Sequence, residues 1–398
     1  MKKLSLILIL ASYCFSNAQI VNIPDLNFKN ALLNHEPIID INNDGEIQFS
    51  EAENTLELYL ENKNISDLAG IESFINLTIL SCPNNQLNNL DVNNNIYLIE
   101  LNCSNNFLNI LEINNHKNLI KLNCNSNSLS TLEVINNLNL TYLRCHSNLL
   151  NILNVSNNTN LIELNCSFNS LNTLDVSNNI YLNRLFCSYN SLTSLDVSNN
   201  IDLIWLYCNS NLLNILNINN NTNLTKLYCG YNSLTTLDLS SNSDFNLLHC
   251  YDNNDLAYIN LKNGNNNNFI LSGAFPSIFE NLPNLQTVCV DELNTDLTNF
   301  ILTETGHDVE FTINCPTANT LENTLLNFTI YPIPVADVIN IKSKTNIAKI
   351  EIFSNLGQLL LSYNHQNSID ISNLSQGLYF VKITDVNGDF GIQKVIKN

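Results

Sequence analysis

Apolar and polar residues alternate with a fixed period of 21 residues over about 77–249. In the copy at 98–113, Leu101 and Cys103 alternate with polar residues, which predicts a short strand with one buried face. Further apolar positions follow, and an Asn-rich turn leads into the next copy. A period of about 20 to 50 residues indicates a solenoid, in which each repeat buries its apolar positions against its neighbours.

Cysteine and asparagine mark the register of these repeats. Nine cysteines occur 21 positions apart, at Cys82, Cys103, Cys124, Cys145, Cys166, Cys187, Cys208, Cys229 and Cys250. An asparagine follows three positions after each, at Asn85, Asn106, Asn127, Asn148, Asn169, Asn190, Asn211, Asn232 and Asn253. This asparagine leaves the strand where the chain turns. We therefore expect its amide to satisfy backbone groups of neighbouring turns that would otherwise be buried without partners.

The pattern Leu-x-x-Leu-x-Cys-x-x-Asn resembles the leucine-rich repeat at its short end, in the style of the internalins. Residues 56–77 resemble an entry repeat without the cysteine, and the period decays after His249. The resemblance implies an α/β-type solenoid, mostly β, over residues 56–290, with a parallel sheet on its concave side. Both ends of such a solenoid need caps, because the terminal repeats have a neighbour on one side only.

The ladder cysteines take the place of inward apolar residues, where cysteine behaves as a small hydrophobe. Repeats stacked about 4.8 Å apart suit parallel side chains better than the Cβ separation of about 3.8 Å in a disulfide. Their number is also odd, so they cannot all pair. We expect buried free thiols, with disulfides or a metal site as the alternatives.

Residues 1–18 have the parts of a secretory signal peptide, namely two lysines, an apolar run and small residues that place cleavage after Ala18. A lipoprotein signal would use Cys14, but Tyr13 precedes it where a small residue is needed. No other apolar run is long enough to span a bilayer. We therefore expect an exported protein without a transmembrane helix.

Residues 19–55 are predicted to form an N-terminal cap, in which a short helix from Pro24 to His35 precedes an EF-hand-like loop at 40–51. The loop fits D-x-[DN]-x-[DN]-G-x5-E at every fixed position. This pattern supplies the oxygen ligands that calcium prefers. The candidate ligands are Asp40, Asn42, Asp44, Glu46 through its backbone carbonyl, Gln48 and Glu51. Because no long second helix follows, we expect a structural calcium ion that stiffens the cap. The alternative is a chance match in an Asn-rich chain.

The period gives way to a C-terminal cap at 291–316, where a covering helix and a further strand are expected. Cys289 and Cys315 lie off the ladder and flank this cap. In an exported protein we expect them to form a disulfide, and the alternative is two unrelated buried thiols. A polar linker is predicted at 317–327.

Residues 328–398 alternate short strands with turns, which predicts an antiparallel β-sandwich. A Tyr-Pro-x-Pro opening at 331–334, an Asn-Leu-Gly turn at 355–357, Leu-x-x-Gly-Leu-Tyr at 374–379 and a Lys-rich end occur in this order. Together they resemble the type A C-terminal sorting domain of the type IX secretion system, with Ile333 where that family usually has asparagine. The resemblance implies the type IX secretion machinery as a partner and passage across the outer membrane. It also implies removal of this domain, and then release or attachment to surface lipopolysaccharide.

The net charge of −20 argues against nucleic acid or anionic lipid as a partner. Charged residues nevertheless make up only 13% of the chain, so most of its polarity comes from asparagine, which suits turns.

The outward positions of the predicted concave sheet lie three and one residues before each cysteine, and one and two residues after it. They carry no aromatic or arginine side chain in the first copies, as at Ile79, Ser81, Asn102, Ser104, Asn123 and Asn125, but become aromatic and basic from the fourth copy on, where the single Trp and both Arg lie. The candidate ligand-binding residues are Tyr142, Arg144, His146, Arg184, Phe186, Trp205, Tyr207, Lys226, Tyr228, His249 and Tyr251, and the same outward positions also hold Phe168, Tyr189 and Tyr231. Exposed aromatic residues beside arginine are typical of binding hot spots.

The first hypothesis for function is therefore a monomeric, secreted or surface-attached binding protein that recognises protein or glycan through its concave face. The second is a structural coat or adhesive component without a single ligand, with the outward aromatics scattered at random. An enzyme is not expected, because the sequence has no nucleophile paired with a base and no phosphate-binding loop. His146 and His249 would lie about 24 Å apart along the sheet and cannot share a metal. An acidic column from Asp91 to Asp238 is interpreted as a solvated flank.

Overall fold

The computed structural model describes residues 19–315, 328–331, 335–343, 345–354, 359–386 and 390–397. They fall into two compact units that divide after Cys315. The predicted signal peptide at 1–18, the linker at 317–327, Ile333 and the Asn-Leu-Gly turn lie outside the described residues.

The N-terminal cap contains α2 (Leu26–Leu33) and α3 (Phe49–Asn54). The first helix begins after Asp25, whose Oδ1 accepts a hydrogen bond from Phe28 N at 2.9 Å. Its Oδ2 accepts hydrogen bonds from the backbone N–H and the hydroxyl of Ser66 at 2.9 and 2.7 Å. One carboxylate therefore caps the helix and ties it to the first repeat. The helix is shorter than the predicted span from Pro24 to His35, because Asp25 is the better N-cap.

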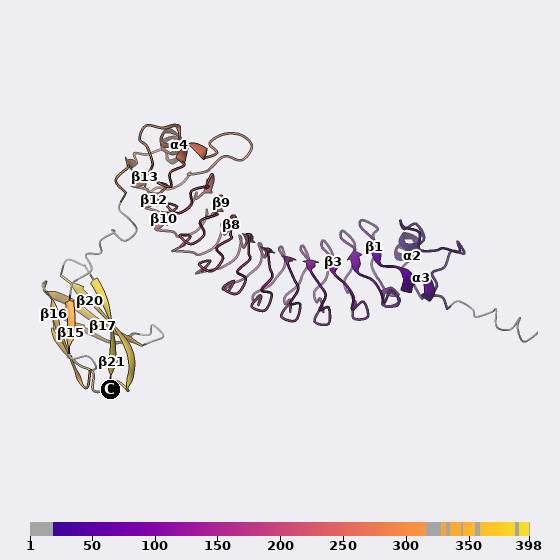
Figure 1. Cartoon of the computed structure of the whole chain (residues 1–398), viewed down its shortest axis with the longest axis horizontal. Helices are drawn as coiled ribbons and strands as arrows, with labels where there is room; N and C mark the ends of the chain where they lie inside the picture. The colour runs from indigo at the N-terminus through magenta and orange to yellow at the C-terminus, as the bar shows by residue number, and fades with distance from the viewer. Residues whose placement is uncertain are drawn as a thin grey trace, which may run out of the picture. The chain divides into compact units, whose positions relative to one another are not determined.

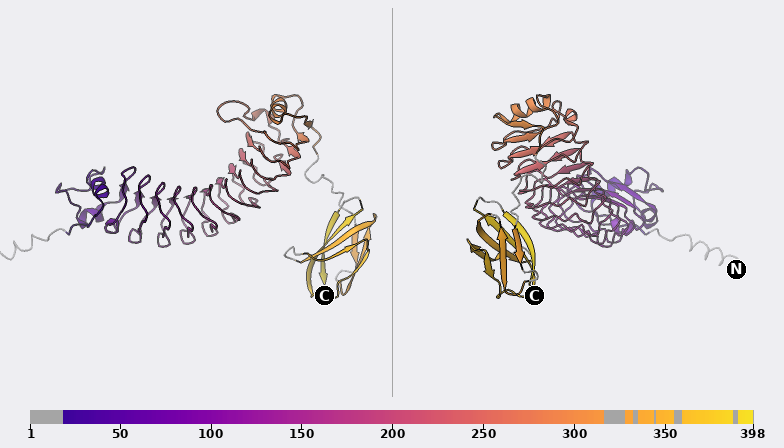
Figure 2. Two further views of the ribbon diagram at one scale, coloured as in Figure 1. Left: turned by 180° about the vertical axis from the view of Figure 1, so that it is seen from behind. Right: turned by 60° about the vertical axis from the view of Figure 1, so that its left-hand side comes forward.

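A ten-stranded parallel sheet runs through the repeats and lines the inner side of the arc that the N-terminal unit forms (Figures 1 and 2). Its strands are β1 (Glu57–Tyr59), β2 (Ile79–Ser81), β3 (Glu100–Asn102), β4 (Lys121–Asn123), β5 (Tyr142–Arg144), β6 (Glu163–Asn165), β7 (Arg184–Phe186), β8 (Trp205–Tyr207), β9 (Lys226–Tyr228) and β11 (Leu247–His249). Successive strands pair with a shift of 21 residues, as in Leu101 opposite Leu122. The middle residue of every strand is buried, which confirms the predicted register.

A second parallel sheet, which was not predicted, begins before the first one ends. It contains β10 (Thr236–Asp238), β12 (Tyr258–Asn260), β13 (Thr287–Cys289) and β14 (Glu310–Thr312). The segment at 282–290, at the end of the predicted solenoid, contributes β13 to this second sheet. The covering helix α4 (Asp296–Thr305) lies between β13 and β14, and Cys289 and Cys315 are joined by a disulfide across this cap.

Two rows of asparagine side chains connect neighbouring repeats. In the first row, Asn169 Oδ1 accepts a hydrogen bond from Leu150 N at 3.0 Å, and its Nδ2 donates to the carbonyls of Cys145 and Cys166 at 3.1 Å. Every ladder asparagine from Asn85 to Asn253 repeats these contacts. Each side chain thus satisfies backbone groups of its own repeat and of the preceding one, as predicted.

The second row lies in the turn opposite the sheet and was not predicted. Asn158, Asn179 and Asn200 are fully buried, and Asn179 Nδ2 donates to the carbonyls of Val155 and Asn158 at 3.0 and 2.8 Å. His116 occupies the equivalent position in one repeat, with Nε2 3.0 Å from the carbonyl oxygen of Val92. The signal was present in the sequence, because these asparagines also recur at 21-residue intervals.

The ladder cysteines from Cys82 to Cys250 are free and buried in the structure. Burial raises the pKa of Cys103, Cys166 and Cys208 to about 12 and moves the pKa of the other ladder thiols in the same direction. They form part of one hydrophobic core that extends from Val21 to Val309. The ladder cysteines therefore have a structural role in the apolar interior.

The C-terminal unit forms two antiparallel sheets around its own core. One sheet contains β15 (Phe328–Tyr331), β16 (Val338–Ser343) and β19 (Ser368–Asp370), and the other contains β17 (Ile347–Ser354), β18 (Leu359–Asn364), β20 (Gly377–Asp385) and β21 (Phe390–Lys397). The arrangement confirms the predicted sandwich. Lys397 is buried, and its Nζ donates a hydrogen bond to the carbonyl of Ile371 at 2.8 Å.

We predict that Asn169→Ala destabilises the solenoid by about 3 kcal/mol, because it leaves buried backbone groups of two repeats without partners. Asn172, exposed in the same repeat, provides the control, and its replacement by alanine should stay within about 0.5 kcal/mol of wild type. Urea unfolding followed by circular dichroism measures both effects. Equal stability of the two variants would show that the asparagine row does not hold the repeats together.

We also predict that the solenoid loses stability as pH rises above about 8.5, the usual pKa of a thiol. The unfolded chain then releases protons that the buried thiols retain, so the folded state binds more protons and stability falls until the folded pKa is reached. The loss is about 1.4 kcal/mol per thiol near pH 9.5. Anaerobic unfolding at about pH 7.5 and 9.5 tests it. A variant with Cys145→Val and Cys166→Val should show a smaller loss of unfolding free energy between these two pH values, in proportion to the two thiols removed. An unchanged loss would contradict the conclusion that the buried thiols cause it.

Candidate ligand-binding face

Trp205 on β8 lies between two cations on the concave face. Its register partners are Arg184 on β7 and Lys226 on β9. Arg184 Cζ lies 5.4 Å and Lys226 Nζ 4.5 Å from the centroid of the indole ring. Cations this close to an aromatic ring are attracted by its quadrupole. The indole therefore holds both long side chains in place before any ligand arrives.

The two arginines share one buried carboxylate. Glu163 on β6 is 3% exposed, and its Oε1 lies 2.7 Å from Arg144 Nε while its Oε2 lies 3.3 Å from Arg184 Nε. Both arginine side chains remain substantially exposed, and Lys226 forms no ion pair with the described residues. We call Arg144, Arg184, Trp205 and Lys226 the cationic strip. It carries three positive charges against one carboxylate, in a chain whose net charge is −20.

A column of stacked rings runs beside the cationic strip. Tyr207 and Tyr228 stack with ring centroids 4.0 Å apart and an angle of 3° between their planes, and Tyr228 and His249 stack at 4.0 Å and 6°. Phe186 meets Tyr207 edge to face at 4.9 Å. Because the rings of Tyr207 and Tyr228 cover each other's faces, the column presents mainly ring edges and hydroxyl groups. Burial, and then the neighbouring Tyr228, raises the pKa of Tyr207.

His249 was predicted to contact the ligand, but the structure buries it. It is only 9% exposed, and its Nε2 lies 2.8 Å from the carbonyl oxygen of Pro276, in the segment that bridges to it through Ile278. This chain segment covers the end of the concave sheet, so His249 terminates the ring column instead of facing solvent. Burial lowers its pKa, which favours the neutral ring.

His146 is half-buried at the other end of the face, where Asn125 Nδ2 lies 2.7 Å from its Nε2. Burial and then the charge of Arg144 lower its pKa. A neutral histidine here adds no further charge to the cationic strip at neutral pH.

A hollow of about 400 Å³ opens on the concave face beside Arg144. Its floor and walls come from β3 to β5, including Asn102, Asn123, Lys121 and Tyr142. No ligand-binding role was predicted for the residues of these early copies. Asn102 and Asn123 leave this space open at one end of the cationic strip, and the ion pair of Lys121 with Glu100 borders it.

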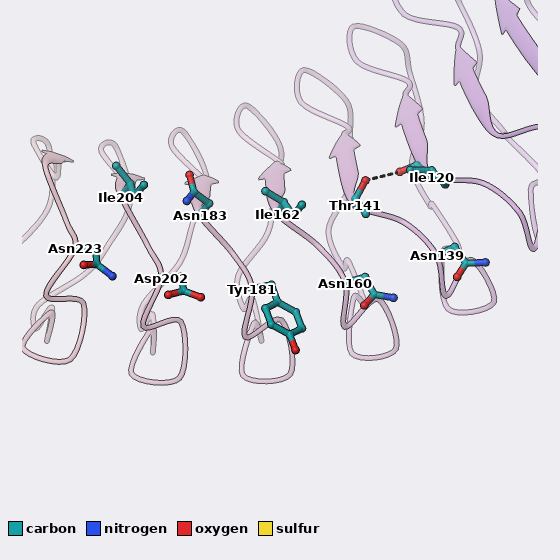
Figure 3. Close-up of a pocket in the computed structure, with 10 residues that line it drawn as sticks. All are labelled: Ile120, Asn139, Thr141, Asn160, Ile162, Tyr181, Asn183, Asp202, Ile204 and Asn223. Carbon is teal, nitrogen blue, oxygen red and sulfur yellow. Dashed lines mark hydrogen bonds between the residues drawn. The ribbon is translucent and has the colours of Figure 1, made fainter.

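A second concavity, of about 760 Å³, lies on the flank of the solenoid before the strands (Figure 3). Figure 3 shows its lining in two rows, one with Ile120, Thr141 and Ile162 and the other with Asn160 and Tyr181. Thr141 Oγ1 donates a hydrogen bond to the carbonyl of Ile120 at 3.3 Å. None of the predicted ligand-binding residues lines this groove.

The predicted calcium loop gathers several of its expected ligands. Asp40 accepts hydrogen bonds from the backbone N–H groups of Asp44 and Gly45 at 3.2 and 3.0 Å. Asn42 Nδ2 and Gln48 Nε2 donate to Asp44 Oδ2 at 3.0 and 2.8 Å. The oxygen-rich set of Asp40, Asn42 and Asp44 therefore fits the chemistry of calcium.

Glu51 differs from the other expected calcium ligands. Its Oε1 accepts a hydrogen bond from Ile41 N and its Oε2 from Gln48 N, both at 2.9 Å, in a capping box at the start of α3. Across the described part of the chain, no group of three or more His, Cys, Asp or Glu side chains is placed to hold a metal ion. An ion in this loop would therefore draw on amide and backbone oxygens as well, and it would share Glu51 with the helix cap.

Comparison with known proteins identifies the C-terminal tail and the repeat fold. Residues 329–398 match the Secretion system C-terminal sorting domain family. The functional domain of InlJ from Listeria monocytogenes, which includes a cysteine ladder, is 24% identical with a TM-score of 0.50, over 96% of this chain and 98% of that one. An internalin (inlF) from Listeria monocytogenes is 18% identical with a TM-score of 0.51, over 73% of this chain and 97% of that one. No curated protein matches the chain.

These findings confirm the internalin-like leucine-rich-repeat fold and the type IX sorting tail, and with them type IX export to the cell surface or into the medium. In the residues that the structure describes, no helix is both long and apolar enough to cross a membrane.

Proposed function

We propose that this exported repeat protein is a binding protein that holds a protein or glycan ligand on its concave face, along the cationic strip and the adjoining hollow. The observation that carries the proposal is the fixed cluster of three cations around one indole and one carboxylate. Such a surface complements acidic groups on a ligand.

Preorganisation supports this proposal. Long basic side chains lose conformational entropy when a ligand immobilises them, at about 0.5–1.5 kcal/mol each. Here Glu163 and Trp205 already restrain Arg144, Arg184 and Lys226 in the free protein. Part of the entropy that these side chains would lose on binding is therefore already lost when the protein folds. This supports a binding role over a passive surface.

The alternative is a structural coat or adhesive component without a single ligand. Scattered surface aromatics would suit that role, whereas an ordered cluster of the chain's only two arginines on one carboxylate favours a defined ligand. We propose binding rather than catalysis, because no nucleophile and base were found together in the sequence.

Trp205→Ala should weaken ligand binding by about 2 kcal/mol or more, as truncation of a hot-spot residue does, with little effect on stability. The physical reason is that both Arg184 and Lys226 lose the ring that restrains them. A protein and glycan array first identifies the ligand, and titration calorimetry then compares variants. Tyr97→Ala, which removes a half-exposed ring on the flank, is the matched control and should bind as wild type does.

Two outcomes would contradict this assignment of the site. If Trp205→Ala binds the ligand with wild-type affinity, the cationic strip is not part of the contact surface. Broad, weak binding to many array members, unchanged in both variants, would favour the coat.

We also propose that calcium binds the loop at 40–51 and stabilises the N-terminal cap. Calcium at about a hundred times its dissociation constant should stabilise the cap by about 2.7 kcal/mol, measured by thermal unfolding with calcium against chelator. Asp44→Ala should abolish the shift. Glu46→Gln should retain it, because Glu46 offers its backbone carbonyl. Identical melting of wild type in calcium and in chelator would disprove the proposal.

A further inference from the structure

Every repeat places the second residue after its ladder cysteine in a left-handed backbone conformation. The φ angles there lie between 50° and 55° in all nine copies, at Asn84, Asn105, Ser126, Ser147, Phe168, Tyr189, Ser210, Tyr231 and Asp252. This conformation suits glycine, asparagine and aspartate and is unusual for a bulky residue. Three copies nevertheless carry an aromatic side chain at this strained position.

The three rings contribute little to the solenoid core. Phe168, Tyr189 and Tyr231 remain 52%, 45% and 53% exposed. Phe168 stacks on Tyr189 with centroids 4.2 Å apart, whereas the next copy on the other side of Tyr189 has only the small side chain of Ser210. Strained backbone positions cluster at functional sites, and these three repeats each hold a ring at such a position without burying it.

A further ring joins Tyr231 at this edge. Tyr251 meets Tyr231 edge to face, with centroids 5.2 Å apart and an angle of 85°. It packs over Gly230, where an added Cβ would lie 2.8 Å from the Tyr251 ring. The preceding copies have Ser188 and Asn209 at the position of Gly230, so the glycine admits this ring.

Polar groups border the rings. The charge of the neighbouring Asp252 carboxylate is the main cause of the raised pKa of Tyr231. Asn281 Nδ2 donates to Asp252 Oδ1 at 3.1 Å. No lysine or arginine of the described residues forms an ion pair with Asp252. This edge is therefore acidic where the concave strip is basic.

We propose that Tyr189, Tyr231 and Tyr251, the edge cluster, form a subsite for a neutral saccharide, opening over Ser210. Tyr189 and Tyr231 are two repeats apart, or about 9.6 Å. Contacts of about 3.5–4.0 Å on each side leave room for one sugar ring. Exposed aromatic rings suit the C–H face of a sugar, while Asp252, Ser210 and the phenols can pair with its hydroxyl groups.

A neutral saccharide fits this edge better than the other candidate ligands. The carboxylate of Asp252 disfavours an acidic sugar, and the polar border offers no apolar depth for an aliphatic peptide side chain. The edge cluster shares only Tyr251 with the residues predicted to bind ligand on the concave face. This inference is therefore separate from the proposed role of the cationic strip.

The test uses the whole chain and four neutral probes: laminarihexaose, cellohexaose, chitohexaose and mannohexaose. Saturation-transfer difference NMR detects which probe binds, and calorimetry measures its affinity. Tyr189→Asn and Tyr231→Asn should each reduce affinity about tenfold or more. Gly230→Ala should also weaken binding, because it displaces Tyr251. Tyr181→Ala, which removes an equally exposed ring from the opposite flank, is the control and should bind as wild type does.

The same variants separate this role from a structural one. Asparagine tolerates the left-handed conformation better than tyrosine, so Tyr189→Asn and Tyr231→Asn should melt no lower than wild type. Loss of saccharide binding in Tyr189→Asn and Tyr231→Asn, which leave Arg144, Arg184 and Lys226 in place, distinguishes this subsite from the cationic strip. Binding of none of the four probes, or binding unaffected by Tyr189→Asn and Tyr231→Asn, overturns the proposal. Capture of peptides instead of saccharides at the edge cluster also overturns it.

Discussion

The asparagine side chain that bridges adjacent repeats is the interaction on which the rest of this structure depends. A repeat of 21 residues with only a three-residue strand leaves most of its backbone outside regular secondary structure. Two rows of amides, represented by the half-buried Asn169 and the fully buried Asn179, supply the missing partners. Because each amide reaches the preceding repeat, satisfying one copy also fixes its neighbour. Stability therefore accumulates along the stack and requires caps at both ends.

The asparagine bridges between repeats also determine how the side chains on the surface of the solenoid are arranged. Amides that hold adjacent copies in strict register place equivalent side chains directly above one another, so aromatic residues in one column contact each other, either stacked or edge to face. Tyr207 and Tyr228 lie 4.0 Å apart for this reason, and their faces are no longer available to a ligand. Trp205 between two cations follows the same rule. A solenoid of this kind can expose the face of a ring only where the next copy has a small residue, as Ser210 follows Tyr189.

The features with a period could be predicted from the sequence, and those that depend on single contacts could not. The register of Leu101 opposite Leu122 and the buried ladder thiols follow from the repeat itself. Nothing in the periodicity reveals that Glu163 is buried between two arginines, since its equivalents Glu100 and Lys121 pair with each other nearer the surface. The covering of His249 by the segment around Pro276 depends on a loop outside the period. The switch to a second sheet at β10 likewise depends on its pairing with β12, which lies beyond the strict period.

The distribution of charge separates structural from functional side chains. On the turns after the second apolar layer, Asp175, Asp196 and Asp238 each accept a hydrogen bond from the backbone N–H of the serine two residues later. These carboxylates thus stabilise turns, and hydrogen bonds from Ser177 and Ser198 lower the pKa values of Asp175 and Asp196. Within the described residues, Arg144, Arg184 and Lys226 of the concave face donate no such hydrogen bond to the backbone. Copies without them, such as the one at Asn102, fold with the same strand and the same register. Since the fold does not require Arg144, Arg184 and Lys226, their gathering around Glu163 and Trp205 supports the binding role proposed above.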